Sequence, residues 1–258
     1  MQNQSEAITG SRKSGIDLSD PVRKGAHRFF RALFRVNPES PAKVVNRVLN
    51  KDTLRLDTDV QFDECDFIGA GHEQLVFRVL YQGEEKALKV NQSSLLVHSD
   101  IASPKFRKIK SDYNRLQGLY ADIPRLIPEE CDVVLKIKLG LISHDAVGVL
   151  QPYIKGLMKC LFTGFESEQE RQEYLADHPN LKSEIKEFAK KTVEKYDSEG
   201  WSINLYGHKL IMIVGEENPY LCIIDPHRID TSESIQRLPE KYQRMYQNRL
   251  NTLRSLAS

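Results

Sequence analysis

The sequence lacks the features that mark membrane-spanning, secreted and zinc-binding chains. No apolar run approaches the roughly 20 residues that a membrane-spanning helix needs. Residues 1–15 are polar and contain no apolar core of the kind found in a secretory signal. The 4 cysteines form no C-x-x-C pair and have no histidine nearby at zinc spacing. We therefore expect a cytoplasmic protein with reduced thiols, and a buried disulfide is the less favoured alternative.

A strong overall charge is also missing. The 258 residues contain 37 Lys and Arg against 36 Asp and Glu, and no motif of a known nucleic-acid reader is present. We therefore expect no nucleic-acid partner. The charge is nevertheless uneven, because residues 1–51 hold 10 Lys and Arg against 4 Asp and Glu. This asymmetry marks the N-terminal part as a distinct unit, for which an anionic partner is one explanation.

Residues 1–52 are predicted to be a flexible tail followed by two basic amphipathic helices. Asp20-Pro21 and Ser40-Pro41 are helix-start signals, and Pro38 ends the first helix. Apolar residues recur at helical spacing after each start, with arginines and lysines between them in the first helix. Two explanations stay open. The helices dock on an anionic membrane or an acidic partner, or their aromatic face packs against the rest of the chain.

The hydrophobic period changes from helical to strand-like at about residue 53. Strands are predicted over residues 54–62, 65–71, 75–83, 84–90, 133–142 and 146–154, and the stretches 202–214 and 219–226 are predicted to be a loop and two short strands around a turn at residues 216–219. Helices are predicted over residues 104–120, 166–198 and 238–256. A two-residue hairpin turn is expected at Gln82-Gly83. Strands followed by a mainly helical half predict an α+β fold and not an alternating parallel one.

The first motif with chemical content is Gly69-Ala70-Gly71, which lies between two predicted strands. Glycine lets backbone amides approach a phosphate, although a tight hairpin explains the pair equally well. Val76 follows 7 residues after Gly69, and Lys89 follows 13 residues after Val76 in an apolar strand. Burying an ammonium group is costly unless it meets an anion. A lysine that reaches out to solvent is the alternative.

Together these residues resemble the protein kinase superfamily. Its signature is a glycine loop, G-x-G-x-x-G-x-V, followed by a lysine on a later strand. Here Gln74 stands in the place of the third glycine. The resemblance extends over residues 60–230 and implies a two-lobed protein kinase-like fold. An antiparallel N-lobe sheet would occupy residues 53–150 and a short, mainly helical C-lobe residues 151–258, after the N-terminal helical extension.

The resemblance also implies roles for residues of the N-lobe. Gly69, Gly71 and Val76 would cover the nucleotide, and Lys89 would contact its phosphates. In kinases this lysine pairs with an acidic residue of the next helix, and Asp112 stands at the matching place, one methylene shorter than glutamate. An ordinary surface charge is the alternative for Asp112. Backbone groups of the segment joining the lobes, from Gln151 to Tyr153, would bind the adenine; alternatively, this is only a buried strand that ends at a proline.

In the C-lobe, Asn204 stands where kinases have the catalytic aspartate, and Lys209 stands 5 residues later at the place of a metal-binding asparagine. Asp225 follows the apolar strand 221–224 in the sequence Asp225-Pro226-His227. This matches the metal-binding aspartate of D-F-G, with a strand-terminal cap as the alternative. The resemblance therefore implies ATP and Mg²⁺ as cofactors, with Asp225 as a metal ligand.

Two of these substitutions affect the expected activity. Asparagine cannot accept the proton of a substrate hydroxyl, and a positioned base typically contributes about 10²–10⁴-fold. Phosphoryl transfer nevertheless depends mostly on positioning and charge. Lys209 either replaces a metal ion or repels magnesium, while His208 and His227 are weak candidates for a replacement base. Only 33 residues follow Asp225, too few for a full peptide-docking platform.

Two hypotheses of function follow from these departures. The first is an atypical ATP-dependent phosphotransferase that acts on a protein or on a small-molecule acceptor. The second is a catalytically silent pseudokinase that uses the same nucleotide pocket as a binding or scaffold module. Asn204 and Lys209 favour the second hypothesis, whereas Lys89, Asp225 and the glycine loop favour the first.

Overall fold

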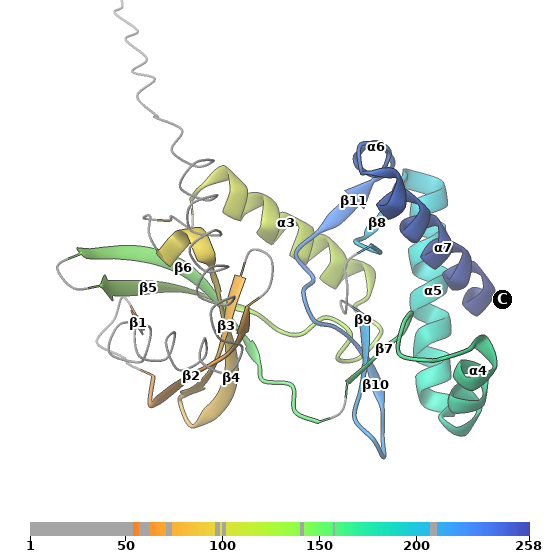
Figure 1. Cartoon of the computed structure of the whole chain (residues 1–258), viewed down its shortest axis with the longest axis horizontal. Coiled ribbons are helices and arrows are strands. Elements are labelled where there is room, and N and C mark those ends of the chain that lie inside the picture. The colour runs from red at the N-terminus through yellow and green to blue at the C-terminus, as the bar shows by residue number, and fades with distance from the viewer. Residues whose placement is uncertain are drawn as a thin grey trace, which may run out of the picture.

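The computed structural model describes residues 54–56, 62–70, 74–95, 99, 102–139, 142–156, 158–206 and 211–258. The helices predicted within residues 1–52 lie outside the described residues, as do Gly71, His208 and Lys209. The described chain is an α+β protein with a strand-rich part up to Pro152 and a mainly helical part after it (Figure 1). Among the described residues, none of the helices is long and apolar enough to cross a membrane. All 4 cysteines are free thiols.

The strand-rich part is a six-stranded antiparallel sheet with the order β1-β5-β6-β4-β3-β2. Its strands are β1 (Leu54–Leu56), β2 (Glu64–Ala70), β3 (Gln74–Tyr81), β4 (Glu84–Asn91), β5 (Cys131–Leu139) and β6 (Ile142–Pro152). The predicted hairpin turn joins β3 to β4, where Gln82 and Gly83 have φ values of 53° and 78°. Positive φ at both positions is what a two-residue hairpin requires, and glycine adopts it without steric cost.

The two faces of this sheet have different roles. Side chains alternate along the strands, so Leu75, Phe77 and Val79 of β3 belong to an apolar core on one face. The opposite face carries Lys89 of β4, which lies in register with Val149 of β6. The long helix α3 (Pro104–Leu119) and the short 3₁₀ helix η1 (Gln92–Leu95) contribute to the cavity on this second face. The alternation therefore turns Lys89 away from the apolar core.

The mainly helical part combines helices with two small antiparallel sheets. Its helices are α4 (Glu168–Asp177), α5 (Pro179–Glu199), α6 (Ser232–Gln236) and α7 (Glu240–Ala257). One sheet has the order β10-β9-β7, and the other pairs β11 with β8. The strands are β7 (Met158–Cys160), β8 (Trp201–Ile203), β9 (Ile211–Val214), β10 (Tyr220–Ile223) and β11 (Ile229–Thr231). The hairpin β9–β10 was predicted, whereas β7, β8, β11 and α6 were not.

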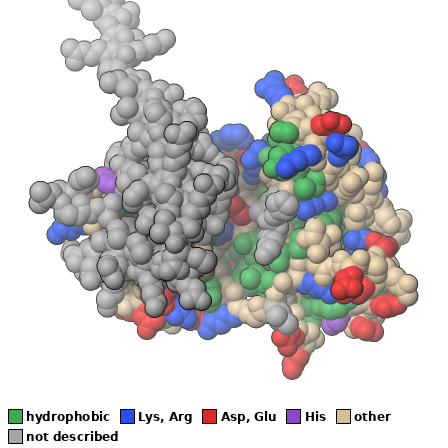
Figure 2. Space-filling model, viewed as in Figure 1, with side chains coloured by type: hydrophobic (Ala, Val, Ile, Leu, Met, Phe, Trp, Pro, Cys, Tyr) green, Lys and Arg blue, Asp and Glu red, His purple; other side chains and the backbone are tan. Residues whose placement is uncertain are grey.

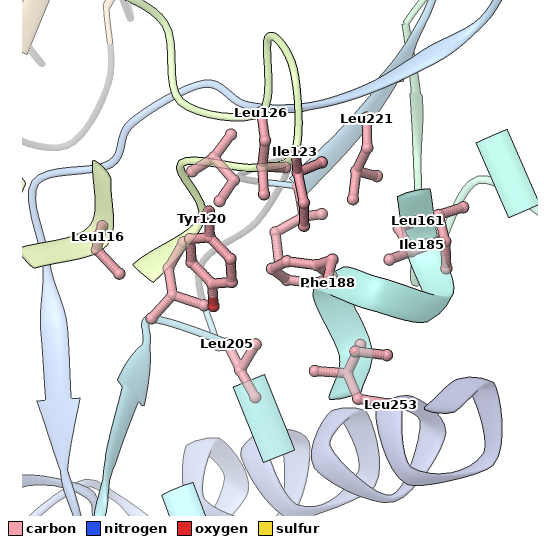
Figure 3. Packing of buried hydrophobic residues seen from close by; sticks show 14 of the residues in the cluster. Leu116, Tyr120, Ile123, Leu126, Leu161, Ile185, Phe188, Leu205, Leu221 and Leu253 are labelled. Atoms are coloured by element: carbon pink, nitrogen blue, oxygen red, sulfur yellow. The ribbon is translucent and has the colours of Figure 1, made fainter. Parts of the chain in front are cut away.

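Helix α3 connects the two parts of the molecule. Its C-terminal end contributes Leu116, and the next residue after the helix is Tyr120; both belong to the core that α5 and α7 form (Figure 3). The hydroxyl groups of Tyr120 and Thr192 lie 2.8 Å apart and share a buried hydrogen bond. The segment after α3 continues this contact, because Ile223 donates its backbone N–H to the carbonyl of Leu126. The position of α3 is therefore fixed by the helical part.

Candidate functional site

The site begins where Lys89 meets the segment after β10. The Lys89 ammonium donates to the carbonyl oxygen of Ile224 at 2.5 Å, although the two residues are 135 positions apart. Lys89 is 7% exposed and lies close enough to Asp225 for their charges to interact. The structure thus brings together the strand lysine and the aspartate on which the sequence analysis depended.

Asp225 is the exposed end of a chain of hydrogen-bonded charged groups. Nδ1 of His227 lies 2.6 Å from Oδ1 of Asp225, and Nε2 of His227 lies 2.7 Å from the carboxylate of Glu130. The side chains of Glu130 and His227 are 1% and 8% exposed, whereas that of Asp225 is 40% exposed. Gln151 also donates from Nε2 to Glu130. The chain therefore runs from a buried glutamate to an aspartate that solvent can reach.

The protonation of this chain follows from its geometry. Burial alone would lower the pKa of His227, but hydrogen bonds to Asp225 and Glu130 outweigh burial and raise that pKa to about 9. Burial would raise the pKa of Asp225, but the His227 hydrogen bond and the positive charge of Lys89 bring it below its usual value. Burial lowers the pKa of Lys89, and the carboxylates of Asp225 and Glu130 offset only part of this effect. At neutral pH, Asp225 is therefore an anion and His227 a cation.

One carboxylate oxygen of Asp225 is available to a further group, such as a metal ion. His227 binds one carboxylate oxygen, and the other makes no hydrogen bond within the described part of the chain. Among the described residues, no group of three or more His, Cys, Asp or Glu is arranged to hold a metal. Magnesium commonly binds through one or two carboxylates, with phosphates and water completing its octahedron. The residues present fit a metal that arrives with a nucleotide, and they do not form a self-sufficient metal site.

Asp112 does not take the place that was predicted for it. Its carboxylate lies 2.7 Å from the ammonium of Lys108, one helical turn earlier on α3. The carboxylates that act on Lys89 are Asp225 and Glu130, and Asp112 is not among them. The predicted Lys89–Asp112 pair is therefore absent, because the Asp112 carboxylate forms an ion pair with Lys108 of the same helix. Glu130, the residue before β5, supplies the buried carboxylate instead.

The other residues predicted for the site lie on the strands β2, β3 and β6 of the same sheet as Lys89, or directly after them. Val76 is its register partner on β3, and Gly69 in turn pairs with Val76 across a β-bulge in β2. A side chain added at Gly69 would meet no atom within 4 Å, so this backbone borders open space. Tyr153 follows β6 and donates its backbone N–H to the carbonyl of Glu85 at 3.2 Å. Gln151 uses its side chain to hold Glu130, which no sequence pattern indicated.

Asn204 directly follows β8. Its backbone N–H donates to the carbonyl of Arg228 at 3.1 Å, so the predicted catalytic segment is tied to the segment that follows Asp225. Asn204 is only 5% exposed. The prediction for Lys209 lies outside the described residues. The pairing of β8 with β11 is the structural reason why the segments around residues 204 and 225 meet.

A small apolar cluster lies beside these polar groups. It contains Met212 and Val214 of β9 together with Cys160 and Cys222, and Ile154 and Ile224 pack against it. Ile154 belongs to the segment that joins the two parts, and Ile224 is the residue whose carbonyl binds Lys89. Figure 2 shows hydrophobic side chains gathered in the middle of the visible face, between the strand-rich and helical parts. The charged chain therefore lies beside a buried apolar cluster, against which the partly buried Ile154 and Ile224 pack.

Comparisons with known proteins give a likeness of fold. No protein-family model matches the chain, and no curated protein does. The chain is similar to Rv3197 from Mycobacterium tuberculosis, solved in complex with erythromycin, at 16% identity and a TM-score of 0.36 over 81% of this chain and 57% of that one. It is also similar to a specific rhoptry antigen kinase domain of Toxoplasma gondii, at 10% identity and a TM-score of 0.38 over 80% of this chain and 66% of that one. The chain spans less than two thirds of both structures.

Proposed function

We propose that this chain is a kinase-like nucleotide-binding protein that takes ATP with Mg²⁺ at Lys89 and Asp225. The observation that carries the proposal is the buried Lys89 ammonium, which is held at the Ile224 carbonyl next to the partly exposed Asp225 carboxylate. A lysine for phosphates and an aspartate for the metal are the two charged parts that kinase sites share. In this proposal the N-lobe is residues 53–150 and the C-lobe residues 151–258, with residues 1–52 as an extension.

The surroundings of Lys89 supply what a nucleotide needs. The apolar cluster with Met212 and Ile224 offers a surface for a base, and the backbone of Gln151 to Tyr153 offers hydrogen-bonding groups nearby. Gly69 lies on β2 and Val76 on β3, the strand that pairs with β4 and Lys89. The open space next to Gly69 would admit a phosphate chain. Asp225 would hold the magnesium ion that accompanies the nucleotide, and that ion would supply positive charge next to the phosphates.

A second function, nucleotide binding without transfer, is favoured by a specific observation. Both ring nitrogens of His227 are engaged by carboxylates, so this histidine has no free nitrogen with which to accept a substrate proton. Asn204 cannot act as the base either. An atypical phosphotransferase would have to rely on charge stabilisation by Lys89, the metal and Lys209. A pseudokinase that serves as a binding or scaffold module requires none of these.

The test of nucleotide binding is a thermal shift with ATP, with and without Mg²⁺. ATP at 100 times its dissociation constant stabilises a folded protein by about 2.7 kcal/mol, or about 5 °C for a chain of this size. We expect Lys89→Ala and Asp225→Ala to lose this shift. The matched controls are Lys138→Ala on an exposed part of β5 and Asp177→Ala at the end of α4, which should keep it. Wild-type shifts in both site variants would overturn the proposal.

A further inference from the structure

A polar cavity lies between helix α3 and the face of the sheet that carries Lys89. Its volume is about 150 Å³, and the described residues that line it come from β3, β4, β6, η1, α3, the segment before α3 and the segment after β10. A water molecule occupies about 30 Å³ in the liquid, so the cavity has room for a group of about five heavy atoms. It shares only Lys89 and His227 with the chain of charged groups described above. Most of its lining is therefore unused by the proposed nucleotide site.

The charged residues that the structure describes in the lining are all basic. Lys89 and Lys105 both line the cavity, and none of the described lining residues is Asp or Glu. Lys89 already has the carboxylates of Asp225 and Glu130 near it. Lys105, by contrast, has no ion-pair partner within the described part of the chain. The excess positive charge of the cavity is thus located at the N-terminal turn of α3, where the helix dipole adds to it.

The hydroxyl groups of the lining are arranged as donors. The Ser99 hydroxyl oxygen accepts the backbone N–H of Val147 at 2.8 Å, and that of Ser103 accepts the N–H of Phe106 at 3.2 Å. A hydroxyl that accepts from an N–H keeps its own O–H available for another acceptor. The Ser94 hydroxyl, on a residue only 6% exposed, makes no hydrogen bond within the described part of the chain. The Ser94 oxygen is not among the fully buried side-chain atoms that lack a partner in the described part of the chain, so solvent reaches it and its O–H is available as a further donor.

We propose that this cavity, which we call the α3 pocket, binds a small tetrahedral oxyanion of the phosphate class. Lys105 and Lys89 supply the charge, and the hydroxyls of Ser94, Ser99 and Ser103 donate hydrogen bonds to the oxygens. Bound there, the anion links the first turn of α3 to the sheet. The ligand is either a free phosphate or the phosphate end of a nucleotide that reaches past Lys89, since both present the same group. The proposal does not require that the chain bind nucleotide.

The test is binding of inorganic phosphate to the full chain in the absence of magnesium and nucleotide. Line broadening of the phosphate ³¹P resonance and a saturable rise in Tm should both be seen, against sodium chloride at equal ionic strength. Lys105→Ala and Ser94→Ala should each weaken binding by at least tenfold. Arg107→Ala is the matched control, because Arg107 is an exposed cation on the same turn of α3 that does not line the pocket. It should bind phosphate like the wild type.

Two further measurements are needed. One distinguishes a free phosphate from the phosphate end of a nucleotide, and the other distinguishes failure of the α3 pocket from failure of the nucleotide site. If magnesium-free ATP competes with phosphate in the wild type but not in Lys105→Ala, the pocket takes the end of the nucleotide. If ATP and phosphate shifts add, the pocket holds a separate anion. No saturable phosphate binding, or equal affinity in Lys105→Ala and Arg107→Ala, overturns the α3 pocket. An ATP shift that survives in Lys105→Ala while phosphate binding is lost leaves the proposed nucleotide site standing.

Discussion

His227 allows a quantitative prediction, because its charge is stabilised by two carboxylates in the folded protein. The difference between its ordinary pKa of 6.5 and its raised pKa of about 9 corresponds to about 3 kcal/mol at 1.36 kcal/mol per unit. The Asp225 side chain is 40% exposed, so water screens its share, and we expect about 2 kcal/mol. His227→Gln should remove this contribution to the free energy of unfolding.

The dependence on pH fixes the sign of this prediction. A pKa that is raised on folding stabilises the folded state fully below about pH 6.5, and the stabilisation is lost as pH rises through about 9. Urea unfolding of wild type and His227→Gln at several pH values between 6 and 10 measures the difference directly. The two free energies should differ most at pH 6 and converge near pH 10. His178→Gln, a histidine of the α4–α5 junction outside this chain of charges, serves as the control. Parallel curves for wild type and His227→Gln would refute the reasoning.

Three other predictions concern the rest of the chain. Glu130→Ala should lower the free energy of unfolding by about 3 kcal/mol, because it removes the more deeply buried of the two carboxylate partners of the His227 cation. The exposed neighbour Glu129→Ala should change little in the same urea titration. Deleting residues 1–50 should lower the melting temperature and increase dye binding to exposed apolar surface if that segment packs on the domain, whereas unchanged melting would favour docking on an anionic partner. The double variant Asn204→Asp, Lys209→Asn is tested by phosphate release from labelled ATP. It should lose activity if the chain is an atypical kinase that uses Lys209 as a cation, and it should gain weak turnover if the chain is a pseudokinase. If the wild type is active and the double variant is equally active, Lys209 is only a solvated lysine.

The elements with strong local signals were predictable from sequence. The Gln82-Gly83 turn requires positive φ, and the repeated apolar residues of α3 follow a Ser103-Pro104 start, so both were located closely. Strands β7, β8 and β11 have only three residues each. Three residues do not complete enough periods to distinguish a strand from a loop. These strands exist because distant segments pair with them, which no local pattern reveals.

The site was predictable only where a strand fixed the position of a side chain. Lys89 and Asp225 each belong to a buried strand or follow one directly, so their meeting could be expected from the resemblance. Glu130 was missed because nothing in the sequence separates it from the adjacent Glu129, and its partner His227 is 97 residues away. The predicted pair of Asp112 with Lys89 was wrong, because spacing alone does not show that the Asp112 carboxylate pairs with Lys108, four residues earlier on the same helix.

The most direct test of the nucleotide site is a calorimetric titration with ATP that separates the role of the metal from that of the lysine. Wild type and Asp225→Asn are titrated with ATP in the presence of Mg²⁺ and again with the metal removed. We expect Mg²⁺ to strengthen ATP binding in the wild type and to have no effect in Asp225→Asn, while Lys89→Ala weakens binding under both conditions by at least tenfold. Equal enhancement by Mg²⁺ in wild type and Asp225→Asn, or ATP affinity unchanged in Lys89→Ala, would contradict the account.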